Sequence, residues 1–275
     1  MNSSDRASAA RPPRAYCLLG AIAGDVIGSV YEFEGCKDYD FELFTESSRV
    51  TDDSILTLAI ADAILSGRSY AECVREYALA HPRAGYGGFF RASMRSSDPQ
   101  PYGSYGNGSA MRVSAVAWAF LRSDQVLEEA KRSAEITHNH PEGIKGAQAI
   151  ALAIFLARTG SSKDTIKQEI TSRFGYDLTP TLSEIWPAYS FDETCQGTVP
   201  PALIAFLESG HFEDAIRKAV SLGGDADTLG AITGSVAEAY YGVPRSIAAE
   251  LHARVLPELW AVVERFSARF ASTPQ

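Results

Sequence analysis

The sequence predicts an all-α fold, a single compact orthogonal multi-helix bundle. Apolar residues recur at spacings of three and four almost throughout, and no convincing run has the alternating period of a β-strand. With 275 residues, 45% of them hydrophobic and 21% charged, the chain can bury a substantial core. Neither a Ser/Gly linker nor a charge run divides it, which favours one domain.

Charge and composition limit where the protein acts. A net charge of -9 argues against binding to nucleic acid or to anionic membranes, and no apolar run reaches the roughly 20 residues of a membrane span.

Residues 1–14 are polar and are predicted to be a disordered leader, so residues 15–272 form the domain. Without a signal peptide or CxxC spacing, we expect reduced thiols in the cytoplasm. The sequence does not fix the oligomeric state, and a monomer is the working expectation.

Helices are predicted from periodicity and from capping signals at their ends. Ser69–Glu72 and Thr181–Glu184 have capping-box spacing, in which a hydroxyl and a carboxylate satisfy free N–H groups. Gly175 and Gly210 lie where C-terminal caps are expected, and Pro141 suits a first helical position. The predicted helices span residues 16–33, 52–66, 70–80, 87–94, 109–122, 124–136, 141–159, 163–174, 181–189, 199–208, 212–221, 226–241, 244–253 and 256–270.

Glycines line one face of the first predicted helix. Gly20, Gly24 and Gly28 recur every four residues, so one stripe of the helix has no side chains. Each glycine costs up to about 1 kcal/mol of helix propensity, which close packing has to offset. The stripe predicts a close approach of this backbone to a neighbouring helix or to a ligand.

The second predicted helix opens on acidic residues. Thr51 is a normal N-cap, and Asp52 and Asp53 lie in the first turn, where the helix dipole stabilises each carboxylate by roughly 0.3 to 1 kcal/mol. On its own, this segment fits an ordinary helix start.

The longest gap between predicted helices, residues 95–108, is rich in Gly, Pro, Ser and Asn. A loop of this length in a compact domain is usually functional or mobile. Glycines at 103, 106 and 108 allow backbone N–H groups to face an anion, and the helix that follows adds its positive end. The loop can therefore bind phosphates without lysines, although "GNG" also suits an ordinary turn.

The helix predicted at residues 226–241 begins with a second acidic segment. Asp225 and Asp227 lie one residue apart beside a long apolar stretch, and Thr228 follows. An unpaired buried carboxylate costs several kcal/mol or more. Either these aspartates are solvated caps, or a cation lies between them.

Taken together, the two acidic segments predict a dinuclear metal site. "TDD" and "DADT" each offer two carboxylates and a threonine hydroxyl, the hard oxygen ligands that Mg²⁺ prefers. If the segments meet, four carboxylates match the charge of two divalent cations about 4 Å apart, as in many hydrolases. We therefore expect two Mg²⁺ ions, with Mn²⁺ as the alternative. The competing interpretation is a helical scaffold that uses acidic caps only for stability.

Four segments, in this order, resemble the motifs of the ADP-ribosylglycohydrolase family: "GAIAGDVIGSVYEFE", "TDDS", "GSYGNGSAMR" and "GGDADTLGAITGSVAEAYYG". The resemblance extends over most of the chain. Members of this family are all-helical, dimagnesium hydrolases that release ADP-ribose from an acceptor. The resemblance implies the same fold and activity here, with an ADP-ribosylated protein or a small ADP-ribose ester as the substrate.

The resemblance also implies roles for particular residues. Glu32 matches the mobile acidic residue that takes part in catalysis in the serine-linkage enzymes, and Glu34 is its local competitor. His138, in "ITHNHPEG", matches a position near the ligand, although a lone histidine is more often structural. The implied metal ligands are Thr51, Asp52, Asp53, Asp225, Asp227 and Thr228. The implied loop for the diphosphate and distal ribose consists of Gly103, Ser104, Tyr105, Gly106, Asn107 and Gly108.

The expected reaction is hydrolysis at the anomeric carbon of an ADP-ribosyl adduct through an oxocarbenium-like state. Glu32 is expected to act as the acid or base that transfers the proton. "SYGNG" resembles the O-linked branch, so serine-ADP-ribose or O-acetyl-ADP-ribose is the expected substrate. The alternatives are an arginine-linked ADP-ribosyl hydrolase, an ADP-ribose-binding module without turnover, and a two-metal phosphohydrolase that releases AMP.

Overall fold

The all-α fold predicted from the sequence is confirmed. The computed structural model describes residues 16–33 and 35–271. Within these residues the chain forms helices and turns, and an isolated bridge between Gly106 and Thr194 is the one pairing of β type. The helices in chain order are α1 (Leu19–Gly28), α2 (Asp52–Ser66), α3 (Tyr70–Ala80), α4 (Gly88–Arg95), α5 (Gly108–Met111), α6 (Ser114–Ala119), α7 (Ser123–Glu135), α8 (Pro141–Arg158), α9 (Lys163–Phe174), α10 (Leu182–Ile185), α11 (Cys195–Leu207), α12 (Phe212–Val220), α13 (Ala226–Tyr241), α14 (Arg245–Arg254) and α15 (Pro257–Phe270).

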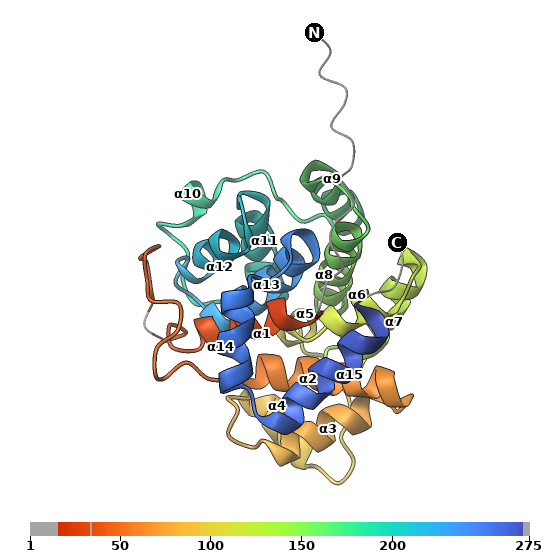
Figure 1. The fold of residues 1–275 in the computed structure, drawn as a ribbon. Coiled ribbons are helices and arrows are strands. Elements are labelled where there is room, and N and C mark those ends of the chain that lie inside the picture. Colours follow the sequence, from red (N-terminus) through yellow and green to blue (C-terminus); the bar gives the residue numbers. More distant parts are fainter. Residues whose placement is uncertain (1–15, 34, 272–275) are drawn as a thin grey trace.

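Helices α1 and α13 form the centre of the molecule. Every residue of α1 is buried, and α13 is buried from its start as far as Ala239. Figure 1 shows α2, α3 and α4 on one side of α1, and α8, α9 and α11 on the other. One continuous hydrophobic core includes side chains from both groups of helices. The acidic segments at the ends of α1, α2 and α13 therefore lie inside this assembly.

The glycine stripe of α1 faces the backbone of α13. A Cβ added at Gly24 would lie 1.9 Å from the carbonyl oxygen of Gly230, and one added at Gly20 would lie 2.1 Å from that of Gly234. At Gly28 the corresponding distance to the Ala226 carbonyl is 2.3 Å. No side chain fits between the two antiparallel helices, so tight helix packing explains the stripe. The contact brings the start of α13 to the end of α1.

Several predicted helices are shorter than their periodicity suggested. The first ends at Gly28 instead of residue 33, and the chain continues in turns. The helix predicted at residues 109–122 is two short helices, α5 and α6, and the one predicted at residues 181–189 is the four-residue α10. In each case apolar residues continue beyond the helix, because the turns and loops that follow are also packed against the core.

Capping signals were partly correct. Thr181 and Glu184 form the predicted capping box, and Gly175 ends α9 in the left-handed conformation. Ser69 precedes α3 without a side-chain capping bond, so the capping box predicted there was wrong. Helix α11 begins at Cys195 and not at residue 199, because the Thr194 hydroxyl accepts from the N–H of Gly197.

The leader predicted at residues 1–14 lies outside the described residues. Within the described part, none of the helices has the length and apolar character needed to cross a membrane.

Replacing Gly24 by Ala tests the contact between α1 and α13. The added methyl group would overlap the Gly230 backbone, which cannot move away as a flexible side chain can. We expect the free energy of unfolding to fall by about 3 kcal/mol, measured by urea denaturation. Gly88→Ala is the control, since nothing lies within 4 Å of a Cβ added there, and it should change stability by less than about 0.5 kcal/mol. Equal stability of the two variants would contradict the contact.

Candidate active site

The two acidic helix starts meet beside the end of α1. Two groups of three carboxylates each have ligand atoms within 4.8 Å of one another. One group consists of Asp25, Asp53 and Asp227. The other consists of Glu32, Asp225 and Asp227. Because Asp227 belongs to both, the groups form one continuous acidic centre, and each group could hold a metal ion.

Asp25, on α1, is a member of this centre that the sequence analysis missed. Its side chain is fully buried. It accepts hydrogen bonds from the N–H and hydroxyl of Thr51 at 3.0 and 2.6 Å, and from the N–H of Ser54 at 3.1 Å. The Ser54 hydroxyl also donates to it. The sequence feature that could have revealed Asp25 is its position inside an apolar, glycine-striped helix, because a buried carboxylate there needs hydrogen-bond partners.

The two aspartates at the start of α2 have different surroundings. Asp53 is buried, and its Oδ2 accepts from the Thr228 hydroxyl at 3.3 Å, while its Oδ1 finds no hydrogen-bond partner among the described residues. Asp52 is only partly buried and belongs to neither group of three. Its Oδ1 lies beside Gly85, 3.1 Å from the position of an added Cβ. Asp53 is therefore the better placed of the two for a shared cation.

Glu32 lies on the turn that follows α1 and is partly buried, whereas the other members of the two groups are buried. Burial, followed by the negative charge of Asp225, raises the pKa of Glu32 to about 7, although Arg49 acts in the opposite direction. Its competitor Glu34 lies outside the described residues. A carboxyl with this pKa can both donate and accept a proton near neutral pH.

The acidic centre is short of positive charge. Burial raises the pKa values of Asp53 and Asp227 well above their usual range, and neighbouring carboxylates raise them further. Burial also raises the pKa values of Asp25 and Asp225, although hydrogen-bond donors oppose this effect. A divalent cation would offset the repulsion and would supply a partner for the free Oδ1 of Asp53. The donor set, all hard oxygen, fits Mg²⁺ or Mn²⁺.

The backbone of the glycine-rich loop, residues 103–108, is largely engaged with the protein itself. Four of its N–H groups, those of Gly103, Ser104, Gly106 and Asn107, donate in order to Asn139 Oδ1, Thr137 O, Ser104 Oγ and Glu193 O. The N–H groups of Gly103 and Gly106 are therefore engaged within the protein, contrary to the expectation that they face an anion. Helix α5 has only four residues, so its positive end is also weaker than expected.

Asn107 connects this loop to the acidic centre. Its side-chain amide donates to Asp225 Oδ2 at 2.6 Å and to the Thr198 hydroxyl at 3.0 Å. The side chain is buried, so both bonds are sheltered from water. Asn107 thus fixes the position of a carboxylate in the centre, a role that the sequence analysis did not anticipate.

Two rings, those of His138 and Tyr105, lie at the glycine-rich loop. His138 is buried, and its Nε2 lies 3.1 Å from the position of a Cβ added at Gly108. Tyr105 is half exposed, and its ring centre is 5.3 Å from that of His140. A buried ring nitrogen and a half-exposed aromatic ring are therefore both available beside this loop.

The segment 85–90 lies beside the start of α2, where Gly85 is close to Asp52 Oδ1. Tyr86 and Phe90 are buried, whereas Phe89 is 84% exposed. The Phe89 ring stacks on Tyr102 with the ring centres 6.5 Å apart. This contact joins the segment to the start of the glycine-rich loop.

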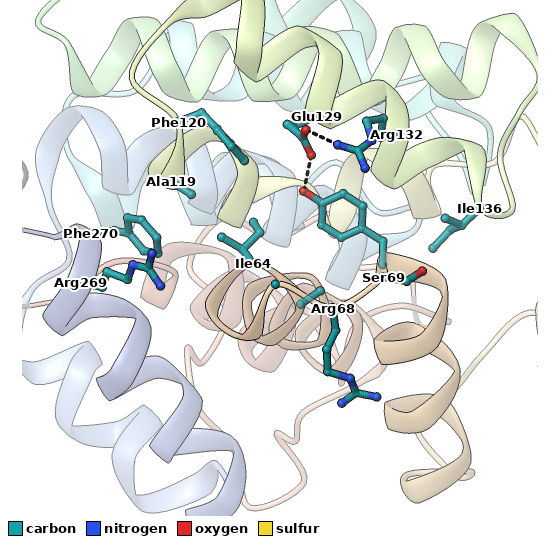
Figure 2. Close-up of a pocket in the computed structure, with 13 residues that line it drawn as sticks. Ile64, Arg68, Ser69, Ala119, Phe120, Glu129, Arg132, Ile136, Arg269 and Phe270 are labelled. Carbon is teal, nitrogen blue, oxygen red and sulfur yellow. Dashed lines mark hydrogen bonds and ion pairs between the residues drawn. The ribbon is translucent and has the colours of Figure 1, made fainter.

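A separate cavity of about 550 Å³ lies at the other end of α2. Figure 2 shows its apolar side chains, among them Ile64 and Phe120, with arginines at the rim. Arg132 is paired with Glu129 at 2.6 Å, and Arg68 is paired with Glu76 outside the cavity. None of the acidic residues of the centre lines this cavity.

The fold and the centre define a class of protein: an all-helical protein with buried carboxylates that could hold a divalent metal ion. The sequence profile of one family, ADP-ribosylglycohydrolase, matches residues 7–274. The chain belongs to the ADP-ribosylglycohydrolase family, whose members are enzymes that hydrolyse the glycosidic bond between ADP-ribose and an acceptor.

Relatives and a solved structure agree with this assignment. ADP-ribosylhydrolase ARH3 of Homo sapiens is 26% identical, over 89% of this chain and 86% of its own. ADP-ribosyl-[dinitrogen reductase] glycohydrolase of Rhodospirillum rubrum is 26% identical over 82% of each chain. ADP-ribosylarginine hydrolase Tri1 of Pseudomonas putida is also 26% identical, over 82% of this chain and 70% of its own. A structure titled "ADP-ribosylglycohydrolase-related protein complex" matches with a TM-score of 0.69 and 26% identity, over 92% of this chain and 95% of that chain.

The raised pKa values predict that the metal-free protein loses stability as the pH rises from about 5 to about 8. Glu32, with a pKa of about 7 in the fold against 4.5 ordinarily, binds its proton more tightly when folded. Its stabilising contribution is complete below the unfolded pKa and is lost as the pH passes the folded pKa. Melting temperatures measured in chelator across this range should fall, and Asp53→Asn with Asp227→Asn should flatten the profile. A melting temperature of the wild type that stays constant across this pH range would contradict the raised pKa values of these carboxyl groups.

Proposed function

We propose that this chain is a Mg²⁺-dependent hydrolase that cleaves the bond between the anomeric carbon of ADP-ribose and an O-linked acceptor, such as serine or an acetyl ester. The observation that carries the proposal is the pair of carboxylate groups sharing Asp227, with Glu32 at the edge. Two adjacent groups with one common carboxylate are what a dinuclear centre needs. We assign residues 15–272 to one catalytic domain that acts as a monomer.

The proposed metal ligands are those implied by the sequence together with Asp25, and Asp227 belongs to both groups of carboxylates. Glu32 lies at the edge of the second group and is assigned to proton transfer. The Thr51 hydroxyl now donates to Asp25 and the Thr228 hydroxyl to Asp53, so both hydroxyl oxygens lie at the centre. Bound divalent cations would orient the sugar hydroxyls and lower the pKa of water.

Glu32 is proposed as the acid and base of the reaction. Cleavage leaves the acceptor oxygen in need of a proton, and addition of water at the anomeric carbon releases one. A single carboxyl with a pKa of about 7 can supply the first proton and take up the second. The other carboxylates are buried deeper and are suited to holding cations.

The remaining candidate residues are proposed to hold the rest of the ligand. As the family resemblance implies, the diphosphate and distal ribose would lie along residues 103–108, where His138 Nε2 lies beside Gly108 and Tyr105 offers a half-exposed ring. Asn107 would act through Asp225. The four cysteines are free, which supports the proposed reducing, cytoplasmic location.

Glu32→Gln tests the proton-transfer role. The amide cannot exchange protons, so turnover should fall by roughly 100- to 10,000-fold, while the affinity for ADP-ribose measured by calorimetry changes little. The control is Glu46→Gln, which alters an exposed acid on the same loop segment. Turnover within twofold of the wild type would remove Glu32 from the mechanism.

Asp227→Asn tests the metal site without an activity assay. In the wild type, saturating Mg²⁺ should raise the melting temperature, because a ligand that binds only the folded state stabilises it. Asp227 belongs to both carboxylate groups, so the variant should lose most of this increase. A melting temperature that Mg²⁺ does not change in the wild type would contradict the site and would favour acidic segments that serve stability alone.

The linkage is tested by product analysis on matched peptides that carry ADP-ribose on serine or on arginine. Release of ADP-ribose from the serine peptide should be at least tenfold faster. Faster release from the arginine peptide would show that the acceptor is arginine and not an O-linked group. AMP as the product would indicate a phosphohydrolase, and ADP-ribose binding without any product would indicate a binding module.

A further inference from the structure

A buried arginine lies behind the candidate ligand-binding histidine. Arg112 follows α5 and is fully buried. Its NH2 donates to two neutral oxygens, Ser133 O at 3.2 Å and Thr137 Oγ1 at 2.8 Å, while its Nε and NH1 have no hydrogen-bond partner in the described part of the chain. Burying a guanidinium without a carboxylate is costly.

The hydrogen bonds around Thr137 determine which ring nitrogen of His138 carries a proton. Thr137 is fully buried, and its Oγ1 lies 2.7 Å from His138 Nδ1. Arginine can only donate, so the hydroxyl accepts from Arg112 and its own proton is free to be donated to Nδ1. The reverse arrangement would leave the hydroxyl proton without an acceptor in a dry environment. Nδ1 is thus the acceptor, and the ring proton lies on Nε2.

Nε2 faces the glycine-rich loop. A Cβ added at Gly108 would lie 3.1 Å from it, and one added at Gly106 would lie 3.5 Å away. Both positions lack side chains, so the space in front of this N–H is kept open. Burial and the charge of Arg112 also lower the pKa of His138 well below its usual value. The ring is therefore neutral near pH 7 and offers one directed donor.

We propose that Arg112 and Thr137 are positioning residues that hold His138 as the Nε2–H tautomer, with this donor directed at an acceptor oxygen of the ligand beside residues 103–108. The identity of that ligand, ADP-ribose, rests on the proposed function. The tautomer itself does not, because it follows from the buried hydrogen bonds alone.

Thr137→Val and Thr137→Ser separate positioning from packing. Valine keeps the volume and removes the hydroxyl, whereas serine keeps the hydroxyl. In ¹⁵N-histidine-labelled protein without ligand, the wild type and Thr137→Ser should show a protonated Nε2 and a hydrogen-bonded, unprotonated Nδ1, and Thr137→Val should lose the hydrogen-bond shift at Nδ1. Arg112→Met, which keeps much of the volume and removes the donor, should also change this signal.

Calorimetry with ADP-ribose gives the second readout. Thr137→Val should bind about tenfold more weakly, as expected for one lost directed hydrogen bond, and Thr137→Ser should restore the wild-type affinity. A protonated Nδ1 in the wild type, or a Thr137→Val variant with unchanged spectrum and affinity, would overturn the proposal. If the wild type fails to bind ADP-ribose, the proposed function fails, while the spectra still decide the tautomer.

Discussion

The backbone contact between α1 and α13 is the constraint on which the site depends. Gly24 and Gly230 allow these helices to approach more closely than any side chain would permit. Asp25, one residue along α1, is thereby brought to the start of α13, where Asp227 lies. A wider separation would leave these carboxylates apart and hydrated. The same absence of side chains that weakens an isolated helix thus concentrates negative charge in the interior.

Neutral donors arrange this charge without neutralising it. Thr51, Ser54, Asn107 and Thr228 bond to the carboxylates and fix their directions. Hydroxyl and amide donors stabilise a carboxylate in place, but they leave its charge available to a cation. A lysine or arginine inside the centre would have satisfied the same oxygens and closed the site to metal.

The sequence predicted the helical class, because hydrophobic periodicity is a local signal. Oxygen-ligand chemistry marked the two acidic segments as possible metal ligands, but only the family resemblance implied that they meet. It missed Asp25, whose importance depends on a neighbour that only the folded chain supplies. It also treated Asp52 and Asp53 alike, although burial separates them. The loop glycines suggested a nest of free N–H groups, but their partners come from distant segments such as Glu193, which no local pattern shows.

Those distant partners tie the loop at residues 103–108 to the start of α11. Asn107 N donates to Glu193 O, Cys195 N donates to Tyr105 O, and Gly106 pairs with Thr194. The two segments, almost ninety positions apart in the chain, are effectively one structural unit. The loop is therefore not a transplantable module: grafted onto another scaffold without the start of α11, it would lose the bonds that hold its shape.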